Sequence, residues 1–359
     1  MNENDINDIR SEKDFRGISF SKYKLSDVKK ELSKSVLNNN IEGSLYWSAE
    51  LICAGHYKDL WEIILSIIGK NIHLGNIKLP IYIELRIQSF KDIISNGYID
   101  NELKMRNNIK IRNLFSELIV ILTLSNKKNS IERVKINKKE YDITDLGASG
   151  RLKANNVSYA NNIFLKEDPK ELFIAINEFC YNISQKICNM LNACYWIEWI
   201  LEYETICNKK KVKCVAERRT FAPVSDKEQK DVIWIIWDSL LQASLQKNKM
   251  IRKTMNSLLN LFSLRYTSGV KKRRIYLLYY AVSLITEPIN FNTQILIKDN
   301  SVIEKVKTKI HLIYKEVKKN EEAPKTGYLF RGTQKERNLE KSIAKIEKMN
   351  SIDTFIPRS

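Results

Sequence analysis

The sequence has few of the residues and motifs on which catalytic and metal sites depend. It contains three histidines, His56, His73 and His311, and its six cysteines form no C-x-x-C pair. Structural zinc sites need several sulfur and imidazole ligands at close spacing, so zinc is not expected. The phosphate-binding G-x-x-x-x-G-K-[ST] loop, G-x-G-x-x-G and G-x-S-x-G are also missing, which argues against ATPases, dinucleotide enzymes and the usual hydrolases. We therefore expect no cofactor, no metal and no catalysis.

Long apolar runs are missing as well. No run reaches the roughly 20 residues that cross a bilayer, so we expect no membrane insertion. The first residues, MNENDINDIR, are polar and acidic, unlike a signal peptide. The sequence therefore predicts an intracellular location, where cysteines act as small buried hydrophobic residues.

Positive charge is what the chain has in excess. Its 359 residues include 60 lysines and arginines against 42 acidic residues, a formal net charge of +18. Such a charge favours polyanionic partners, and nucleic acid is the first candidate. The alternative is an AT-rich genome, which enriches Lys, Asn and Ile in proteins of any function. Only clustering of the charges distinguishes these two explanations.

The cations gather in two segments. One is a connection between predicted helices, and the other begins a helix beside three tyrosines. Loops with this many cations can follow a phosphate backbone, whereas an ordinary run of charges is a solvated face. We predict that both segments converge on one nucleic-acid-binding face. Its residues are Lys209, Lys210, Lys211, Lys213, Arg218, Arg219, Lys271, Lys272, Arg273 and Arg274.

Hydrophobic periodicity predicts an all-α fold with many helices. Pro80 suits the first turn of a helix, and Asp168, Ser225 and Ser301 are predicted to cap three others. Over 131–143 the period changes, so one small β-hairpin remains open there. Other predicted helices cover 109–124, 191–206, 251–266, 272–286 and 302–318, and one begins at Leu25.

Composition divides the chain into two helical subdomains. The stretch Gly147 to Asn156 has the character of a linker and sets the boundary between them. The predicted organisation is a polar N-terminal arm at 1–24, a helical subdomain at 25–146, the linker at 147–156, a helical subdomain at 157–320 and a charged tail at 321–359.

Tyrosine-tryptophan and tryptophan-acid pairs recur inside the apolar helical segments. Aromatic side chains bury large areas, so we expect the indoles of Trp47, Trp196, Trp234 and Trp237 to be largely buried.

Three carboxylates follow these aromatic pairs, namely Glu50, Glu198 and Asp238. If they met, they would form a metal or acid/base cluster. We favour a structural role, in which each binds a nearby Arg, Lys or indole N–H, because a buried carboxylate needs a partner.

Nearly the whole chain resembles an uncharacterised protein family of the nucleocytoplasmic large DNA viruses, the mimivirus-like and phycodnavirus-like giants. That family carries no established activity. The resemblance implies a viral protein located in the host cytoplasm or viral factory, or in the virion, with viral proteins as partners. The matching segments are Phe15 to Tyr23, Tyr46 to His56, His73 to Asn76, Asp168 to Glu178, Tyr195 to Trp199 and Trp234 to Asp238.

A weaker likeness covers Ile41 to Ile72. The string Ser44 to Ile52, followed by Trp61 and Ile63-Ile64, is similar to the helical C-terminal collar of clamp-loader-like AAA+ replication and repair ATPases. Such a collar implies oligomerisation or gripping of a partner, and this chain lacks the ATPase half.

The sequence and the resemblance together predict a non-enzymatic basic helical adaptor that serves viral DNA replication, repair or another process on the genome. The alternative is a virion structural protein, a minor capsid or internal protein that binds other proteins. An enzyme built on the three carboxylates is a third possibility. The oligomeric state, the partners and the choice between DNA and RNA stay open.

Overall fold

The chain folds as a stack of α-helices, which confirms the predicted fold class. The computed structural model describes residues 5–98, 102–137, 141, 150–289, 291, 296 and 299–322. Within these ranges there is no β-strand, and the one β-bridge joins Ile18 to Lys24. The hairpin considered for 131–143 does not form over 131–137, and 138–140 and 142–143 lie outside the described residues.

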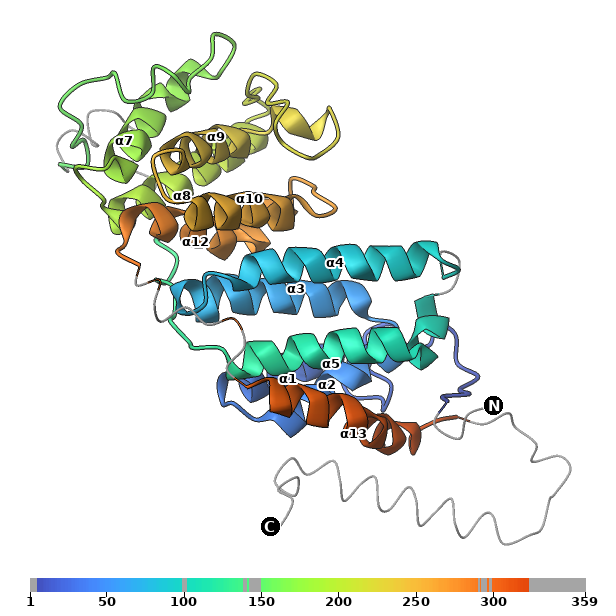
Figure 1. Cartoon of the computed structure of the whole chain (residues 1–359). Coiled ribbons are helices and arrows are strands. Elements are labelled where there is room, and N and C mark those ends of the chain that lie inside the picture. The colour runs from blue at the N-terminus through green and yellow to red at the C-terminus, as the bar shows by residue number, and fades with distance from the viewer. Residues whose placement is uncertain are drawn as a thin grey trace, which may run out of the picture.

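One half of the molecule is built mainly from the N-terminal helices (Figure 1). Asparagine side chains cap two of them, since Asn40 accepts a hydrogen bond from the Gly43 amide and Asn108 from the Lys110 amide. Pro80 lies in the first turn of its helix, as predicted. The helices are α1 (Leu25–Leu37), α2 (Ile41–Cys53), α3 (Tyr57–Ile67), α4 (Leu79–Ser95) and α5 (Ile109–Leu124), with a π-helical turn at Ile68–Ile72 and 3-10 turns at His73–Gly75 and Glu102–Asn107.

The other half contains the helices from the middle of the chain (Figure 1). Asn189 and Asn248 cap two of them by accepting the amides of Asn192 and Ile251. These helices are α7 (Phe173–Ile183), α8 (Met190–Lys209), α9 (Ile233–Ser244), α10 (Lys249–Ser263), α11 (Val270–Arg273) and α12 (Ile275–Thr286), with 3-10 turns at Lys170–Leu172 and Glu228–Lys230.

The predicted helix starts at Asp168, Ser225 and Ser301 need correction. The Asp168 carboxylate binds Arg219 and the Glu217 amide, and α7 begins after a 3-10 turn. A 3-10 turn also separates Ser225 from α9. In the last case Asp299, rather than Ser301, is the cap, and it accepts the Ser301 amide. At the first of these helix starts, Asp168 binds distant groups in the fold and does not cap the helix. At the last, the neighbouring acid Asp299 takes the place of the predicted cap.

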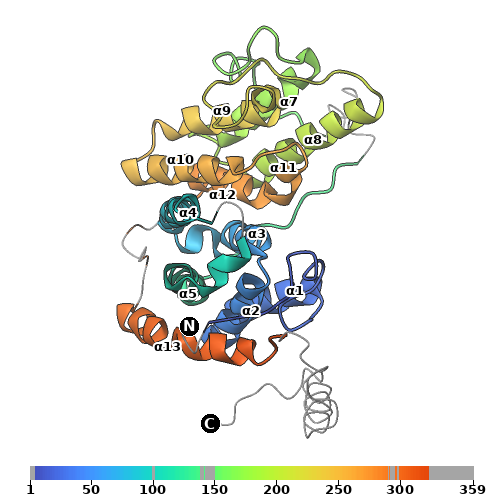
Figure 2. The same ribbon diagram turned by 90° about the vertical axis from the view of Figure 1, so that its right-hand side faces the viewer.

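The last described helix, α13 (Asn300–Lys318), belongs with the N-terminal helices. The sequence assigned it to the second subdomain, but it packs across α2 and α5 (Figure 2). The Arg112 guanidinium lies 4.1 Å from the Tyr314 ring centroid, and Lys307 forms a 2.9 Å ion pair with Glu117. The two halves are therefore not consecutive in sequence, and periodicity along the chain could not show this.

The N-terminal arm packs into the fold, although its polar sequence predicted an arm without core residues. Phe15 and Phe20 are fully buried, and the Arg10 guanidinium lies 4.7 Å from the centroid of each ring. Lys318 donates to the Asp5 carbonyl, and the Ile9 amide donates to the Glu322 carbonyl. The N-terminal arm is therefore hydrogen-bonded to the C-terminal end of α13 and to the residues that follow it. The rest of the predicted tail, from 323 onward, lies outside the described residues.

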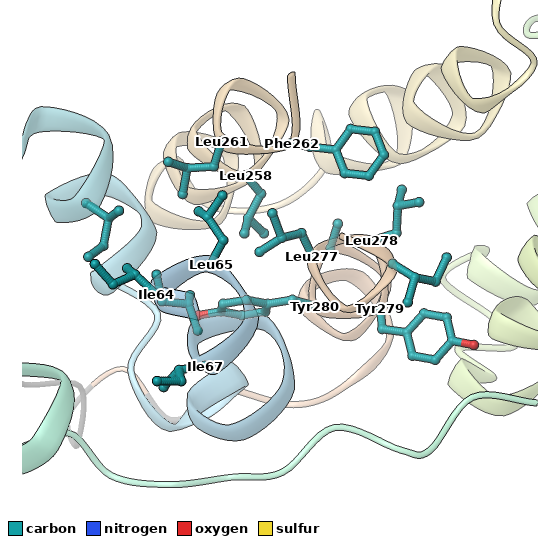
Figure 3. Packing of buried hydrophobic residues seen from close by; sticks show 14 of the residues in the cluster. Ile64, Leu65, Ile67, Leu258, Leu261, Phe262, Leu277, Leu278, Tyr279 and Tyr280 are labelled. Carbon is teal, nitrogen blue, oxygen red and sulfur yellow. The ribbon is translucent and has the colours of Figure 1, made fainter. Parts of the chain in front are cut away.

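One hydrophobic core runs through both halves. Leu65 of α3 points toward Leu258 of α10 and lies near Leu277 of α12 (Figure 3), and Ile64 belongs to the same cluster. In the predicted linker, Glu178 accepts hydrogen bonds from the amides of Lys153 and Ala154, while residues 147–149 lie outside the described part. The described linker residues are therefore anchored to the second half.

The tryptophans are part of this core to different degrees. Trp196, Trp234 and Trp237 are at most 1% exposed, which confirms the prediction for these three. Trp47 is only partly buried, and its ring packs edge-on against Tyr23 at 5.5 Å. For Trp47 the prediction of a largely buried indole is therefore wrong.

Candidate nucleic-acid interface

An exposed basic loop follows α8. The chain leaves the helix through Lys210 and turns at Lys211, which has a positive φ of 56°. The Val212 amide closes the turn by donating to the Cys207 carbonyl at 2.9 Å. The side chains of Lys209, Lys210, Lys211 and Lys213 are all exposed. We call these four lysines the α8 basic loop.

The second cationic segment lies beside α8. Lys272 in α11 donates a 2.9 Å hydrogen bond to the Thr205 hydroxyl and lies 3.7 Å from the Glu202 carboxylate. Thr205 and Glu202 are in the last two turns of α8, so Lys272 lies on the part of α8 that leads to the basic loop, and Figure 2 shows α11 beside α8. The next residue, Arg273, is exposed. The folding of α11 against α8 thus brings the two sequence segments together.

Lys271, the neighbour of Lys272, has a different environment. It is 4% exposed, and its ammonium group binds the carboxylates of Glu204 and Asp231. Asp231 also accepts a hydrogen bond from the Tyr266 hydroxyl. Burial raises the pKa of Glu204, and the charge of Lys271 opposes that rise. Lys271 therefore holds α8 to α11 and cannot reach a nucleic-acid backbone.

Arg274 is buried in the same way. Its guanidinium forms an ion pair with Glu62 of α3 and donates hydrogen bonds to the carbonyls of Phe262 and Leu264. These contacts join α12, α10 and α3. The Arg274 guanidinium therefore stabilises the packing of these helices and is not available to a nucleic-acid backbone.

The pair Arg218 and Arg219 is divided between surface and interior. Arg218 is exposed and forms an ion pair with Asp226. Arg219 is 3% exposed, and it binds Asp168 at 2.7 Å and Asp238 at 3.3 Å. Of the ten predicted residues, Arg219, Lys271 and Arg274 are thus interior cations, and the prediction that they contact nucleic acid is wrong for these three. The other seven are exposed, so the predicted interface can include only them.

Other exposed cations lie on faces that the sequence prediction did not include. On α10 they are Lys249, Arg252 and Lys253, and on α13 they include Lys305 and Lys309. Lysines at i and i+4 on the polar side of an amphipathic helix were the available signal. Such a signal does not distinguish a solvated face from a binding face.

The three carboxylates that follow the aromatic pairs occupy separate environments. Glu198 forms an ion pair with Arg133 and accepts the Tyr279 hydroxyl, and Asp238 pairs with Arg219. Glu50 is fully buried and accepts hydrogen bonds from Ser19 and Ser21.

Burial raises the pKa of Glu50 and of Asp238. The favoured structural role holds for all three carboxylates, with hydroxyls in place of the expected cation at Glu50. In the described ranges, no three His, Cys, Asp or Glu side chains are grouped so as to hold a metal ion.

His56 contacts a backbone carbonyl, and His73 packs against an aromatic ring. The His56 ring is 2.7 Å from the Ile18 carbonyl oxygen, and the neighbouring Cys53 thiol is fully buried. Burial raises the pKa of that thiol far above the physiological range. His73 is also buried and stacks on Tyr280 at 4.8 Å.

Comparison of the chain with protein-family models, with curated proteins and with solved structures finds no match. The resemblance to large DNA virus proteins and to clamp-loader collars stays a prediction. In the part of the chain that the structure describes, no helix is long and apolar enough to cross a membrane.

Proposed function

We propose that this protein is a non-enzymatic, basic helical adaptor that binds nucleic acid through the α8 basic loop, in the replication or another genome-linked process of a large DNA virus. The contact surface consists of Lys209, Lys210, Lys211 and Lys213, extended by Lys272 and Arg273 on α11. The viral context comes from the sequence resemblance alone.

The observation that carries the proposal is the density of exposed, unneutralised cations at one place. Among the described residues, no carboxylate oxygen lies within 4.0 Å of the ammonium groups of Lys209, Lys210, Lys211 or Lys213. Lysines at the end of a helix are also favoured by the helix dipole, which explains two of them without a partner. The dipole does not explain the exposed Arg273 of α11, whereas Lys272 is balanced in part by Glu202.

The proposal is tested by the salt dependence of binding to duplex DNA. Each phosphate contact releases condensed counterions, so the slope of log affinity against log salt reports the number of contacts. For the triple variant K209A/K210A/K211A we expect the magnitude of the slope to fall by about three. Unrelated DNA sequences should lose affinity alike, because phosphate contacts position a protein without reading bases.

A matched control is the variant K249A/R252A/K253A on α10, which removes the same charge from another exposed face. Its slope should equal that of the wild type. Equal slopes for the wild type and the α8 variant would contradict the proposal. The excess charge would then reflect genome composition or a protein-binding surface, and the virion structural protein would become the better explanation.

A further inference from the structure

A cavity of about 650 Å³ lies between the N-terminal arm and the 3-10 turn Glu102–Asn107. Asn107 ties its two walls together, because its side chain accepts the Ile6 amide and donates to the Ile6 carbonyl, both at 2.9 Å. The volume falls in the range of small-molecule sites in proteins. The cavity is separate from the α8 basic loop and was not expected from the sequence.

An interior cation without a carboxylate partner lines this cavity. Arg106 is 7% exposed, and its guanidinium donates to two backbone carbonyls, those of Cys53 and Asp8. Among the described residues, no carboxylate oxygen lies within 4.0 Å of it. A guanidinium has five N–H donors, so several remain for a ligand. The buried cations Lys271 and Arg274, in contrast, each have a carboxylate partner.

A second guanidinium, that of Arg10, lies close to Arg106. Arg10 and Arg106 both lie over the Phe20 ring, at 4.7 and 5.9 Å from its centroid. The charge of Arg10 is neutralised by Asp8, which it binds at 2.6 Å. Burial lowers the pKa of Arg106, and the nearby Asp8 opposes this lowering by more than Arg10 adds to it. An anion that binds Arg106 directly would further offset the cost of burial.

The mouth of the cavity carries charges of both signs. The exposed residues Glu12 and Lys13 and the cation Lys104 lie on its rim, while Ile6 and Leu103 supply apolar wall. Four cations and two acids therefore line the cavity, and Arg10 already engages one of the acids. This balance favours a ligand that carries negative charge and a small apolar or aromatic part.

We propose that this cavity binds the phosphate group of a phosphomonoester, with Arg106 as its principal ligand and Lys13 as a weaker contact at the mouth. The same chemistry is offered by a free nucleotide and by the 5′-phosphate end of a nucleic-acid strand.

Thermal unfolding of the full chain with small ligands tests the site. Adenosine 5′-monophosphate should raise the Tm in a saturable manner, inorganic phosphate should do so more weakly, and adenosine should leave it unchanged. Stabilisation by a ligand follows from its selective binding to the folded state. A 5′-phosphorylated oligonucleotide compared with its 5′-hydroxyl form then distinguishes the two sources: a preference for the phosphorylated strand assigns the strand end, and no preference assigns the free nucleotide.

Variants of the mouth test the location without disturbing the interior. Removal of a single exposed charge changes affinity only modestly, so we expect E12Q to bind the monophosphate about three-fold more tightly and K13A about three-fold more weakly. R106Q should lose binding by more than about ten-fold, in line with the loss of a charge-assisted hydrogen bond. Because R106Q removes hydrogen bonds that hold Cys53 and Asp8, the opposite signs for E12Q and K13A provide the decisive result.

The matched control is K253A, an exposed lysine on α10, which should bind as the wild type does. The K209A/K210A/K211A variant should also keep monophosphate binding, so that failure of this site and failure of the α8 basic loop are distinguishable. Equal Tm shifts from adenosine and its monophosphate would overturn the proposal. So would affinities that respond alike to E12Q, K13A and K253A.

Discussion

The exposed cations of the α8 basic loop and α11 differ from the interior cations between α8, α9 and α11, although the two groups are neighbours in the sequence. Lys272 faces solvent, while Lys271 is enclosed by two carboxylates. Arg218 is at the surface, while Arg219 is 3% exposed. A cation therefore serves the fold where buried carboxylates from other segments enclose it. It stays accessible to a partner where its carboxylate contacts are at the surface, as for Lys272 with Glu202 and Arg218 with Asp226.

Removal of an interior cation should reduce stability far more than removal of an exposed one. The K271A variant leaves Glu204 and Asp231 without their shared partner, and we expect it to lower the free energy of unfolding by about 3–5 kcal/mol. Urea unfolding at pH 7 measures this loss. The neighbouring K272A variant, which removes an exposed lysine, should stay within about 0.5 kcal/mol of the wild type. Equal losses for the two variants would contradict the division.

The same comparison applies to the tryptophans. Trp196 is 1% exposed, and truncation to alanine should cost about 3–5 kcal/mol of stability. For W47A we expect about 1–2 kcal/mol, because part of that indole is already in contact with water. Chemical unfolding of both variants checks the order. A larger loss for W47A would mean that the N-terminal arm depends on Trp47 more than its burial indicates.

The buried His73 provides a further test of the interior, because its burial makes the stability of the fold depend on pH. Burial lowers the pKa of His73 from 6.5 to about 4. Between these values the unfolded chain binds a proton that the folded chain does not, so stability falls as pH drops from 6.5 toward 4, by about 3 kcal/mol. Unfolding curves at pH 7, 6, 5 and 4.5 should show this fall for the wild type.

The H73N variant is a suitable reference, because asparagine tolerates the positive φ of 47° at this position and does not titrate. Its stability should depend less on pH over the same interval. Parallel curves for the wild type and H73N would exclude His73 as a cause of acid destabilisation.

Periodicity predicted most helices of this chain. Helix α5 has the predicted bounds, and α8 and α10 differ from their predictions by a few residues at the ends. These segments have a long apolar repeat that local sequence alone defines. The placement of α13 on α2 and α5, and of Phe15 and Phe20 in the core, depends on packing between distant segments.

The candidate interface was predictable only in part. The α8 basic loop was found from its composition, and its exposure agrees with that prediction. The interior positions of Lys271 and Arg274 depend on Glu204, Asp231 and Glu62, which are distant in sequence. The cavity beside Arg106 joins residues about a hundred positions apart. No local pattern marks such pairs.

Lysine acetylation of the folded chain, with and without duplex DNA, tests the central claim most directly. Mass spectrometry of each site reports the accessibility of its ammonium group. We predict that Lys209, Lys210, Lys211 and Lys213 react readily and become protected by DNA, that Lys271 stays unreactive in both conditions, and that Lys249 and Lys253 react alike in both. Rapid acetylation of Lys271 in the folded chain, or protection of α10 in place of the α8 basic loop, would contradict this account.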